Sequence, residues 1–201
     1  MLDIDFEKLK QNTIEHELRF KGRALFTGKE VSLKLKPLPE NSGIVFQRID
    51  LPNKPKILAN LDNVIKSNRC TSIGCKNFSI QTVEHLLSTL NGMGIDNLLI
   101  EIDGPEVPIG DGSSNVFINL IKKTKIIDQK EHKKPLIITK PFFFVEKDVH
   151  MIALPYHEFK ISSTLHYPNV DLLNHRYLSL SINPENFKKH IAFCRTFAVY
   201  E

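Results

Sequence analysis

The stretch from Gln81 to Ser114 constrains the fold of this chain more than any other part of it. It reads QTVEHLLSTLNGMGIDNLLIEIDGPEVPIGDGSS. Its first part carries apolar residues at helical spacing, namely Val83, Leu86, Leu87 and Leu90. This spacing predicts an amphipathic helix with Thr82 as its N-cap. The run 95–102 then predicts a largely buried strand, and the acidic, proline- and glycine-rich end predicts a tight turn.

Strand-like patterns precede this helix and a second helix follows it. Alternating or apolar runs predict strands within 13–20 and over 31–35, 43–49 and 70–74. The second helix is expected to begin near Ser113, with Val116, Phe117, Leu120 and Ile121 on its inner face. The charged run 122–135 is interpreted as the end of that helix followed by a linker. We therefore expect residues 1–128 to form one α+β domain.

A second unit is expected over residues 134–201. Strand patterns occupy 136–139, 142–146, 151–154 and 159–166, and Asn183-Pro184-Glu185 is typical of a short helix start. An apolar run then follows at 191–199. A unit of this length can bury only a small core. We therefore expect it to be the truncated start of a second α+β domain.

Composition excludes several classes of protein. With 41% hydrophobic and 25% charged residues among 201, the chain is ordinary for a globular protein. No apolar run is long enough to span a bilayer, and the acidic start MLDIDFEKLK is unlike a signal peptide, so we expect a cytoplasmic location. Three cysteines argue against a disulfide framework. A net charge of +4 is too diffuse to indicate nucleic-acid binding.

Glu84 and His85 form the most chemically suggestive pair. Imidazole is a good zinc ligand, and a carboxylate close to a metal can take a proton from bound water. An isolated Glu-His dipeptide is more often a polar pair in the first turn of a helix, where glutamate favours the helix dipole. The surrounding residues decide between these interpretations.

The whole stretch resembles the signature of the zinc-dependent UDP-3-O-acyl-N-acetylglucosamine deacetylases. In that family the signature reads close to TVEHLxxAL-G-IDN-xIE-xGPE-PI-DGS, and here TVEHL, GIDN, GPEVPI and DGS stand in the same order. The resemblance implies that His85 is a zinc ligand and that Glu84 is the general base. It also implies an α+β fold of two domains with similar topology, whose helices pack between two sheets. The turn at Asp111 and Gly112 is expected to be structural.

Two further segments match the family. Arg195-Thr196-Phe197 corresponds to its A-R-T-F segment, so the resemblance implies that Thr196 stabilises the oxyanion and that Phe197 lies against the substrate. The segment 67–71 corresponds to a loop that lines the substrate cleft, which implies substrate contacts for Cys70 and Thr71.

Two departures limit what the resemblance implies. Phenylalanine stands at Phe26, where the family has a histidine close to its active site. The family's other zinc ligands, in an H-x-x-x-D helix, and its general-acid histidine lie beyond the R-T-F segment, and none of the histidines here has an aspartate four residues on. We therefore expect the N-terminal two-thirds of such an enzyme, and no turnover by this chain alone.

The implied reaction is zinc-dependent hydrolysis of the acetamide of UDP-3-O-acyl-N-acetylglucosamine. Its products are acetate and the free amine, and the reaction commits material to lipid A biosynthesis. The expected cofactor is Zn²⁺, the expected partner is this substrate, and the chain is expected to be a monomer without nucleic-acid or integral membrane partners.

Two alternatives stay open. The chain can be a non-catalytic, truncated fragment that lacks the H-x-x-x-D ligands. It can also be a cysteine hydrolase in which His85 activates Cys70, although nothing in the sequence supplies an orienting third group. A structural zinc site of Cys70, Cys75 and His85 lacks a fourth ligand and the usual spacing.

Overall fold

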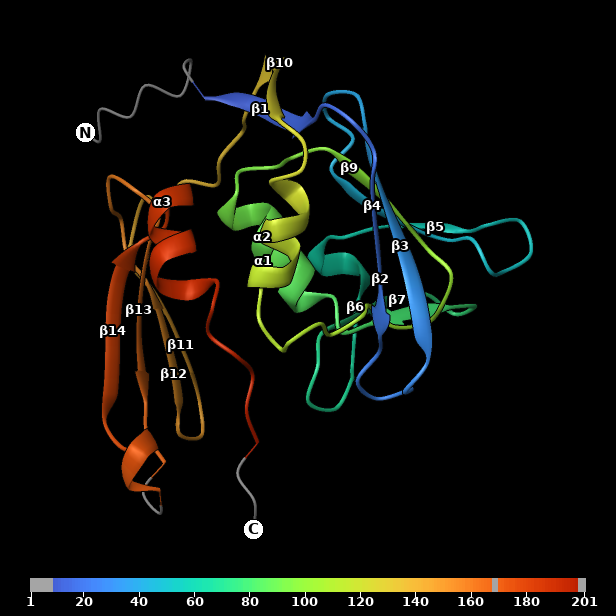
Figure 1. The fold of residues 1–201 in the computed structure, drawn as a ribbon. Helices are drawn as coiled ribbons and strands as arrows, with labels where there is room; N and C mark the ends of the chain where they lie inside the picture. The colour runs from blue at the N-terminus through green and yellow to red at the C-terminus, as the bar shows by residue number, and fades with distance from the viewer. Residues whose placement is uncertain (1–8, 168–169, 199–201) are drawn as a thin grey trace.

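A five-stranded sheet covered by two helices carries the first unit of the fold (Figure 1). The computed structural model describes residues 9–167 and 170–198. The elements of the first unit, in chain order, are β1 (Lys10–Ile14), β2 (Leu18–Arg23), β3 (Glu30–Pro37), β4 (Ile44–Arg48), β5 (Lys56–Leu58), the 3-10 turn η2 (Leu61–Asn63), β6 (Val64–Ile65), β7 (Ser72–Gly74), β8 (Ser79–Gln81), α1 (Glu84–Gly92), β9 (Leu98–Ile102), α2 (Asn115–Ile121) and β10 (Ile126–His132).

The second unit consists of two hairpins and a short helical segment. Its elements are β11 (Phe142–Glu146), β12 (Val149–Ala153), β13 (Lys160–Leu165), the 3-10 turn η3 (Asp171–Leu173), β14 (Arg176–Ser181), α3 (Pro184–Asn186) and the π-helical turn η4 (Phe187–Ile191). In Figure 1, α3 and η4 face α1 and α2, so the helices of both units lie between the strands of the first unit and those of the second. Both helices and strands are present, which confirms the predicted α+β class.

The main sheet has the order β2-β3-β9-β4-β5, with β4 and β9 parallel and the other pairs antiparallel. Alternate residues of its strands point to α1 and α2, as period-2 patterning requires. Fully buried side chains on this face include Leu33, Leu35, Phe46, Ile100 and Ile102. They pack in one core with helix residues such as Leu86, Leu90 and Phe117.

Most of the predicted elements of the first unit are confirmed. Strands β3, β4, β7 and β9 and helices α1 and α2 lie within or close to the predicted ranges, and the stretch 13–20 is divided between β1 and β2. In the second unit β11, β12 and β13 match predicted strands. Asn183 caps α3, since its side chain accepts a hydrogen bond from the N–H of Asn186 at 2.9 Å. The predicted strand at 136–139 is wrong, and β14 was not predicted.

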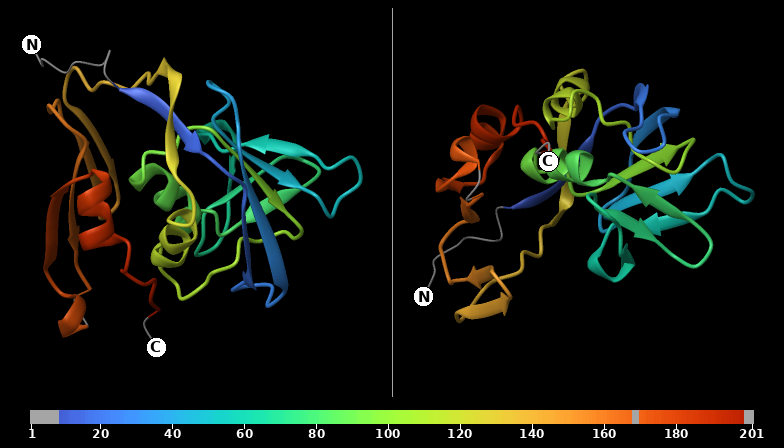
Figure 2. Two further views of the ribbon diagram at one scale, coloured as in Figure 1. Left: turned by 45° about the horizontal axis from the view of Figure 1, so that its top comes forward. Right: turned by 90° about the horizontal axis from the view of Figure 1, so that it is seen from below.

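The predicted linker at 122–135 is also wrong, because its residues 126–132 form β10. This strand pairs antiparallel with β1, and the two cross the end of the helical layer side by side (Figure 2). Residues 128–132 of β10 are all polar or charged, so this segment resembled a solvated linker. β10 is mostly exposed and therefore needs no apolar pattern, whereas Gln11, Thr13 and Ile14 of β1 are buried. Contacts of this ribbon with the rest of the fold determine its position.

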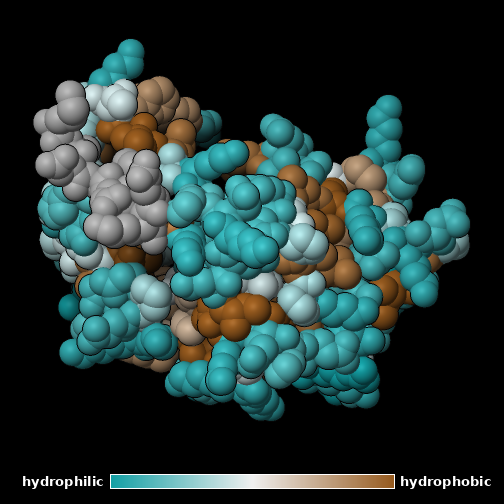
Figure 3. All heavy atoms as spheres, turned by 90° about the horizontal axis from the view of Figure 1, so that it is seen from above, coloured by the Kyte–Doolittle hydropathy of each residue, from teal (hydrophilic) through white to brown (hydrophobic). Residues whose placement is uncertain are grey.

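Asn97 supplies the central contact of this ribbon. The side chain is 1% exposed, and its Nδ2 donates to Gln11 Oε1 at 2.9 Å and to Gln129 Oε1 at 2.7 Å. Its Oδ1 accepts the N–H of Gly43 at 2.8 Å. One buried amide thus joins β1, β10 and the start of β4 to the segment that leads into β9. Figure 3 shows the face of the molecule on which this ribbon lies, and on this face hydrophilic side chains separate smaller apolar patches.

The hairpins of the second unit expose much apolar surface. The exposed large hydrophobic residues of β11 and β12 are Phe142, Phe143, Phe144, Val145, Val149, Met151 and Ile152. They point to both faces of the hairpin, because they follow one another directly along each strand. None of the helices among the described residues is long and apolar enough to cross a membrane.

The amide network gives a stability prediction. Replacing Asn97 with alanine leaves two glutamine side chains and a backbone N–H without their partner in a buried place. We expect the free energy of unfolding to fall by about 3 kcal/mol, since each unsatisfied buried group costs roughly 1–3 kcal/mol. Urea unfolding measures the change, with the exposed Asn91→Ala as matched control. Equal stability of the two variants would contradict the role given to Asn97.

Candidate functional site

The start of α1 depends on a left-handed residue and a buried carboxylate. Thr82 has φ 57° and precedes Val83, which lies at the N-cap position without a side-chain cap. The prediction that Thr82 caps the helix is therefore wrong. Its Oγ1 instead donates to Glu106 Oε1 at 3.2 Å. This contact compensates for a backbone conformation that a β-branched residue rarely adopts.

Glu106 accepts three hydrogen bonds from two other segments of the chain. Its carboxylate is 0% exposed and accepts the backbone N–H groups of Phe26 and Thr27, each at 2.8 Å, as well as the hydroxyl of Thr82. Burial raises the pKa of Glu106, but these donors together outweigh it and hold the pKa below its usual range. The sequence analysis did not single out Glu106. The only local hint of a special role was a charged residue in a short segment between Pro105 and Pro108.

Glu84 contacts the loop before β7. Glu84 is half-buried in the first turn of α1, and its Oε2 accepts the N–H of Thr71 at 3.0 Å. Cys70 is adjacent, and its Sγ lies 3.7 Å from the Ser72 hydroxyl oxygen. Within the described residues no hydrogen bond joins Cys70 to His85. The cysteine-hydrolase hypothesis therefore gains no support.

His85 and Thr196 contact the same turn, which we call the DGSS turn (residues 111–114). The carbonyl of His85 accepts the hydroxyl of Ser114 at 3.2 Å. On the other side of the turn, the N–H of Thr196 donates to the carbonyl of Gly112 at 2.8 Å. The turn thus joins the start of α1 to the predicted oxyanion residue, although they are far apart in sequence.

The DGSS turn is itself rigidly hydrogen-bonded. Asp111 Oδ1 accepts the Ser113 hydroxyl at 2.7 Å and the Ser113 N–H at 3.1 Å, and Gly112 adopts φ 83°, which favours glycine. This confirms the predicted structural role of both residues. Arg195 Nη2 lies 3.8 Å from Asp111 Oδ2. The hydrogen bond from Ser113 lowers the pKa of Asp111, and the charge of Arg195 lowers it further.

Phe197 lies beyond Thr196 and is exposed. Its ring makes an edge-to-face contact with Tyr167, with the centroids 6.2 Å apart. Phe26, at the position of the family's histidine, is 49% exposed, and its backbone rather than its ring holds Glu106. Val199, the last residue of the predicted apolar run, lies outside the described residues.

The residues present do not make up a zinc site by themselves. Among residues 9–167 and 170–198, no group of three histidine, cysteine, aspartate or glutamate side chains is placed to hold a metal ion. His85 offers one imidazole in the cluster, whereas catalytic zinc usually takes three protein ligands. The donor chemistry suits one ligand of a zinc ion and falls short of a complete set.

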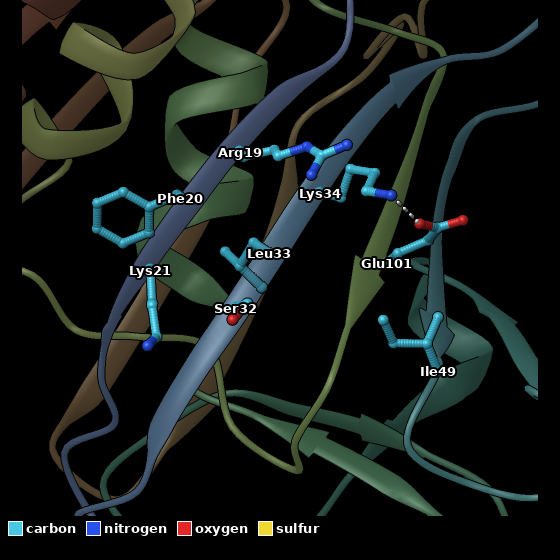
Figure 4. Close-up of a pocket in the computed structure, with 8 residues that line it drawn as sticks. All are labelled: Arg19, Phe20, Lys21, Ser32, Leu33, Lys34, Ile49 and Glu101. Carbon is cyan, nitrogen blue, oxygen red and sulfur yellow. Dashed lines mark ion pairs between the residues drawn. The ribbon is translucent and has the colours of Figure 1, made fainter.

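Two pockets lie away from the residues around the DGSS turn and the start of α1. The first, of about 330 Å³, lies on the face of the main sheet opposite the helices and contains Arg19, Lys21 and Lys34 (Figure 4). Each cation already faces a carboxylate: Arg19 pairs with Glu17 at 2.9 Å, Lys21 with Glu30, and Lys34 with Glu101 at 3.7 Å. The second, of about 360 Å³, borders the Asn97 network. Neither pocket includes a predicted site residue.

Comparison with known proteins assigns this chain to one family. The family described as UDP-3-O-acyl N-acetylglycosamine deacetylase matches residues 11–201. A UDP-3-O-acyl-N-acetylglucosamine deacetylase of Chlamydia pneumoniae is 42% identical over 191 residues, which cover 94% of this chain and 68% of the relative. The Bdellovibrio bacteriovorus protein of the same name is 36% identical over 187 residues, covering 93% of this chain and 62% of the relative.

The buried carboxylate gives a pH-dependent prediction. Because its folded-state pKa is lowered, Glu106 adds stability above an unfolded-state pKa of ~4.3, and this stability is lost as the pH falls through the folded-state pKa. We expect Glu106→Gln to lower the free energy of unfolding by about 2 kcal/mol at neutral pH, and by much less in acid.

Urea unfolding of both proteins at about pH 7 and about pH 3 measures this difference. The exposed Glu131→Gln is the matched control, and we expect it to leave the pH dependence of stability unchanged. A Glu106→Gln defect of the same size at both pH values would show that the lost interaction does not depend on ionisation.

Proposed function

Because the chain belongs to the UDP-3-O-acyl-N-acetylglucosamine deacetylase family, we propose that it acts on UDP-3-O-acyl-N-acetylglucosamine. The proposed reaction hydrolyses the acetamide to the free amine and acetate, and commits material to lipid A biosynthesis. The observation that carries the proposal is the DGSS turn, which contacts the helix start with Glu84 and His85 on one side and Thr196 on the other.

Glu84 is proposed as the general base. Its Oε2 accepts a hydrogen bond from the N–H of Thr71, which fixes the orientation of the carboxylate. The side chain therefore loses less conformational entropy when substrate binds. A half-buried carboxylate in this orientation takes the proton from a water as that water attacks the acetamide carbon. Cys70 and Thr71, in the same loop, are proposed to contact the substrate.

Thr196 is proposed to stabilise the oxyanion. The backbone N–H of Thr196 donates to the carbonyl of Gly112, so the backbone from which the exposed Thr196 side chain projects is held beside the DGSS turn. A hydroxyl donor aimed at developing negative charge is worth roughly 100-fold or more in rate. The exposed ring of Phe197 is proposed to lie against the substrate.

Zn²⁺ is proposed as the cofactor, with His85 as one ligand. When bound at such a site, zinc supplies a water with a pKa of about 7. The described residues do not complete its ligand set, so the proposal requires further ligands besides His85. We therefore expect this chain alone to bind zinc weakly and to release no acetate from the substrate.

Isothermal titration with Zn²⁺ and an acetate-release assay test that expectation. A weak zinc affinity that His85→Ala abolishes, together with no turnover, is the expected result. Zinc-dependent deacetylation by the 201-residue chain would contradict it. Equal zinc affinity of the His85→Ala variant would remove His85 from the proposed ligand set.

A chimaeric protein tests the catalytic proposal. It joins all 201 residues of this chain to the C-terminal part of the Chlamydia pneumoniae relative that lies beyond the match, and the matched portion is 68% of that relative. We expect the chimaera to deacetylate the substrate and Glu84→Ala to reduce kcat roughly 100-fold or more, because the general base is lost.

Ser88→Ala is the matched control, since Ser88 is exposed on the same helix. We expect its kcat to equal that of the unmodified chimaera. A folded chimaera with full activity after Glu84→Ala would sink the assignment of the base. A folded chimaera inactive in every form would count against the proposed function itself.

A further inference from the structure

The second unit touches the first through very little buried surface. Of the described residues from 142 to 198, Phe187 and Ala192 are the only ones classed as buried, with 3% and 1% of their surface exposed. Both belong to a small cluster that is separate from the main core and also contains Ile118 of α2. Apolar burial is the main source of docking energy. The position of the second unit therefore depends largely on the Phe187 side chain.

The Phe187 ring occupies the space that a side chain at position 92 would fill, and this space is open because residue 92 is glycine. A Cβ built at Gly92 meets the Phe187 ring at Cγ, at Cδ1 (2.5 Å) and at Cδ2 (2.6 Å). Real Cβ atoms do not approach other carbons this closely, so any side chain at this position displaces the ring. Gly92 is the last residue of α1 and is not among the glycines with positive φ. The backbone conformation of Gly92 thus does not require glycine, whereas the contact with Phe187 does.

A short hydrogen-bonded segment connects Phe187 to Thr196. From Phe187 the chain continues through η4, where the Ala192 N–H donates to the Phe187 carbonyl at 2.9 Å and the Cys194 N–H to the Ile191 carbonyl at 2.9 Å. Two residues later the Thr196 N–H reaches the Gly112 carbonyl at 2.8 Å. This segment is therefore held at two points along α2, at Ile118 by Phe187 and just before the helix by Thr196.

We propose that Gly92 is a positioning residue: it forms a socket for Phe187, and this socket holds the 192–198 segment so that Thr196 stays against the DGSS turn. The consequence for catalysis rests on the proposed function of Thr196. The docking itself does not, and it is measured here without substrate or turnover.

Helix propensity and the socket predict opposite effects for Gly92→Ala. Alanine favours a helix more than glycine does, so α1 alone is stabilised by this substitution. The socket predicts that Phe187 is expelled and that the 192–198 segment loses its protection. Hydrogen exchange separates the two effects, because it reports on local opening in each segment.

The experiment measures amide exchange by mass spectrometry in the whole chain. We expect Gly92→Ala to speed exchange in peptides covering 192–198 roughly tenfold or more, while peptides covering 98–102 of β9 keep the rate of the unmodified chain. Phe187→Val is expected to have the same effect without touching α1. Asn91→Ala, an exposed change on the same helix, is expected to leave both regions unchanged.

The double variant decides whether Gly92 acts through Phe187. If it does, Gly92→Ala adds little to the exchange rate of a chain that already carries Phe187→Val, since contacting residues couple. Full additivity of the two changes, or unchanged exchange at 192–198 in Gly92→Ala, overturns the proposal. If Gly92→Ala does not fold, unchanged exchange at 192–198 in Phe187→Val overturns it equally. If Gly92→Ala in the chimaera speeds exchange at 192–198 but leaves activity unchanged, the docking stands and the role proposed for Thr196 is contradicted.

Discussion

The buried carboxylate of Glu106 is the interaction on which the candidate site depends. A charge without solvent is costly unless donors surround it, and here the donors come from the loop at Phe26 and Thr27 and from Thr82. The same contact stabilises the left-handed backbone of Thr82, and that backbone sets the direction in which α1 begins. The first turn of α1 carries Glu84 and His85. A residue without a proposed chemical role thus determines where the proposed base and ligand lie.

The rest of the site is assembled by backbone groups more than by side chains. Glu84 is oriented by the Thr71 N–H, His85 is tied to the DGSS turn through its carbonyl, and Thr196 reaches the same turn through its N–H. Backbone contacts tolerate changes of side chain at neighbouring positions. The Phe26 N–H can therefore donate to Glu106 whatever side chain stands at this position. The ring itself is exposed and takes no part in that contact.

The errors of sequence interpretation have a common cause. The 126–132 strand has charged residues where a buried strand has apolar ones, and the predicted strand at 136–139 is apolar but unpaired. A distant partner decided the first outcome, because β1 pairs with 126–132, and the lack of a pairing strand among the described residues decided the second. Thr82 was predicted to cap a helix because its residue type and place allow it, but Glu106, distant in sequence, captured its hydroxyl. Local patterns carry no information about such partners.

The sequence by itself determined the α+β class, the main helices and strands, and the family, because periodic burial and a long ordered motif are both written locally in the chain. It also singled out Glu84, His85 and Thr196. Only the tertiary structure decided which of these residues share a neighbour, that Glu106 lies at the start of the site, and that Gly92 receives Phe187. The physical reason is that a hydrogen bond or a packing contact needs two residues that are close in space. The type of one residue does not specify which of many suitable residues elsewhere in the chain will be its partner.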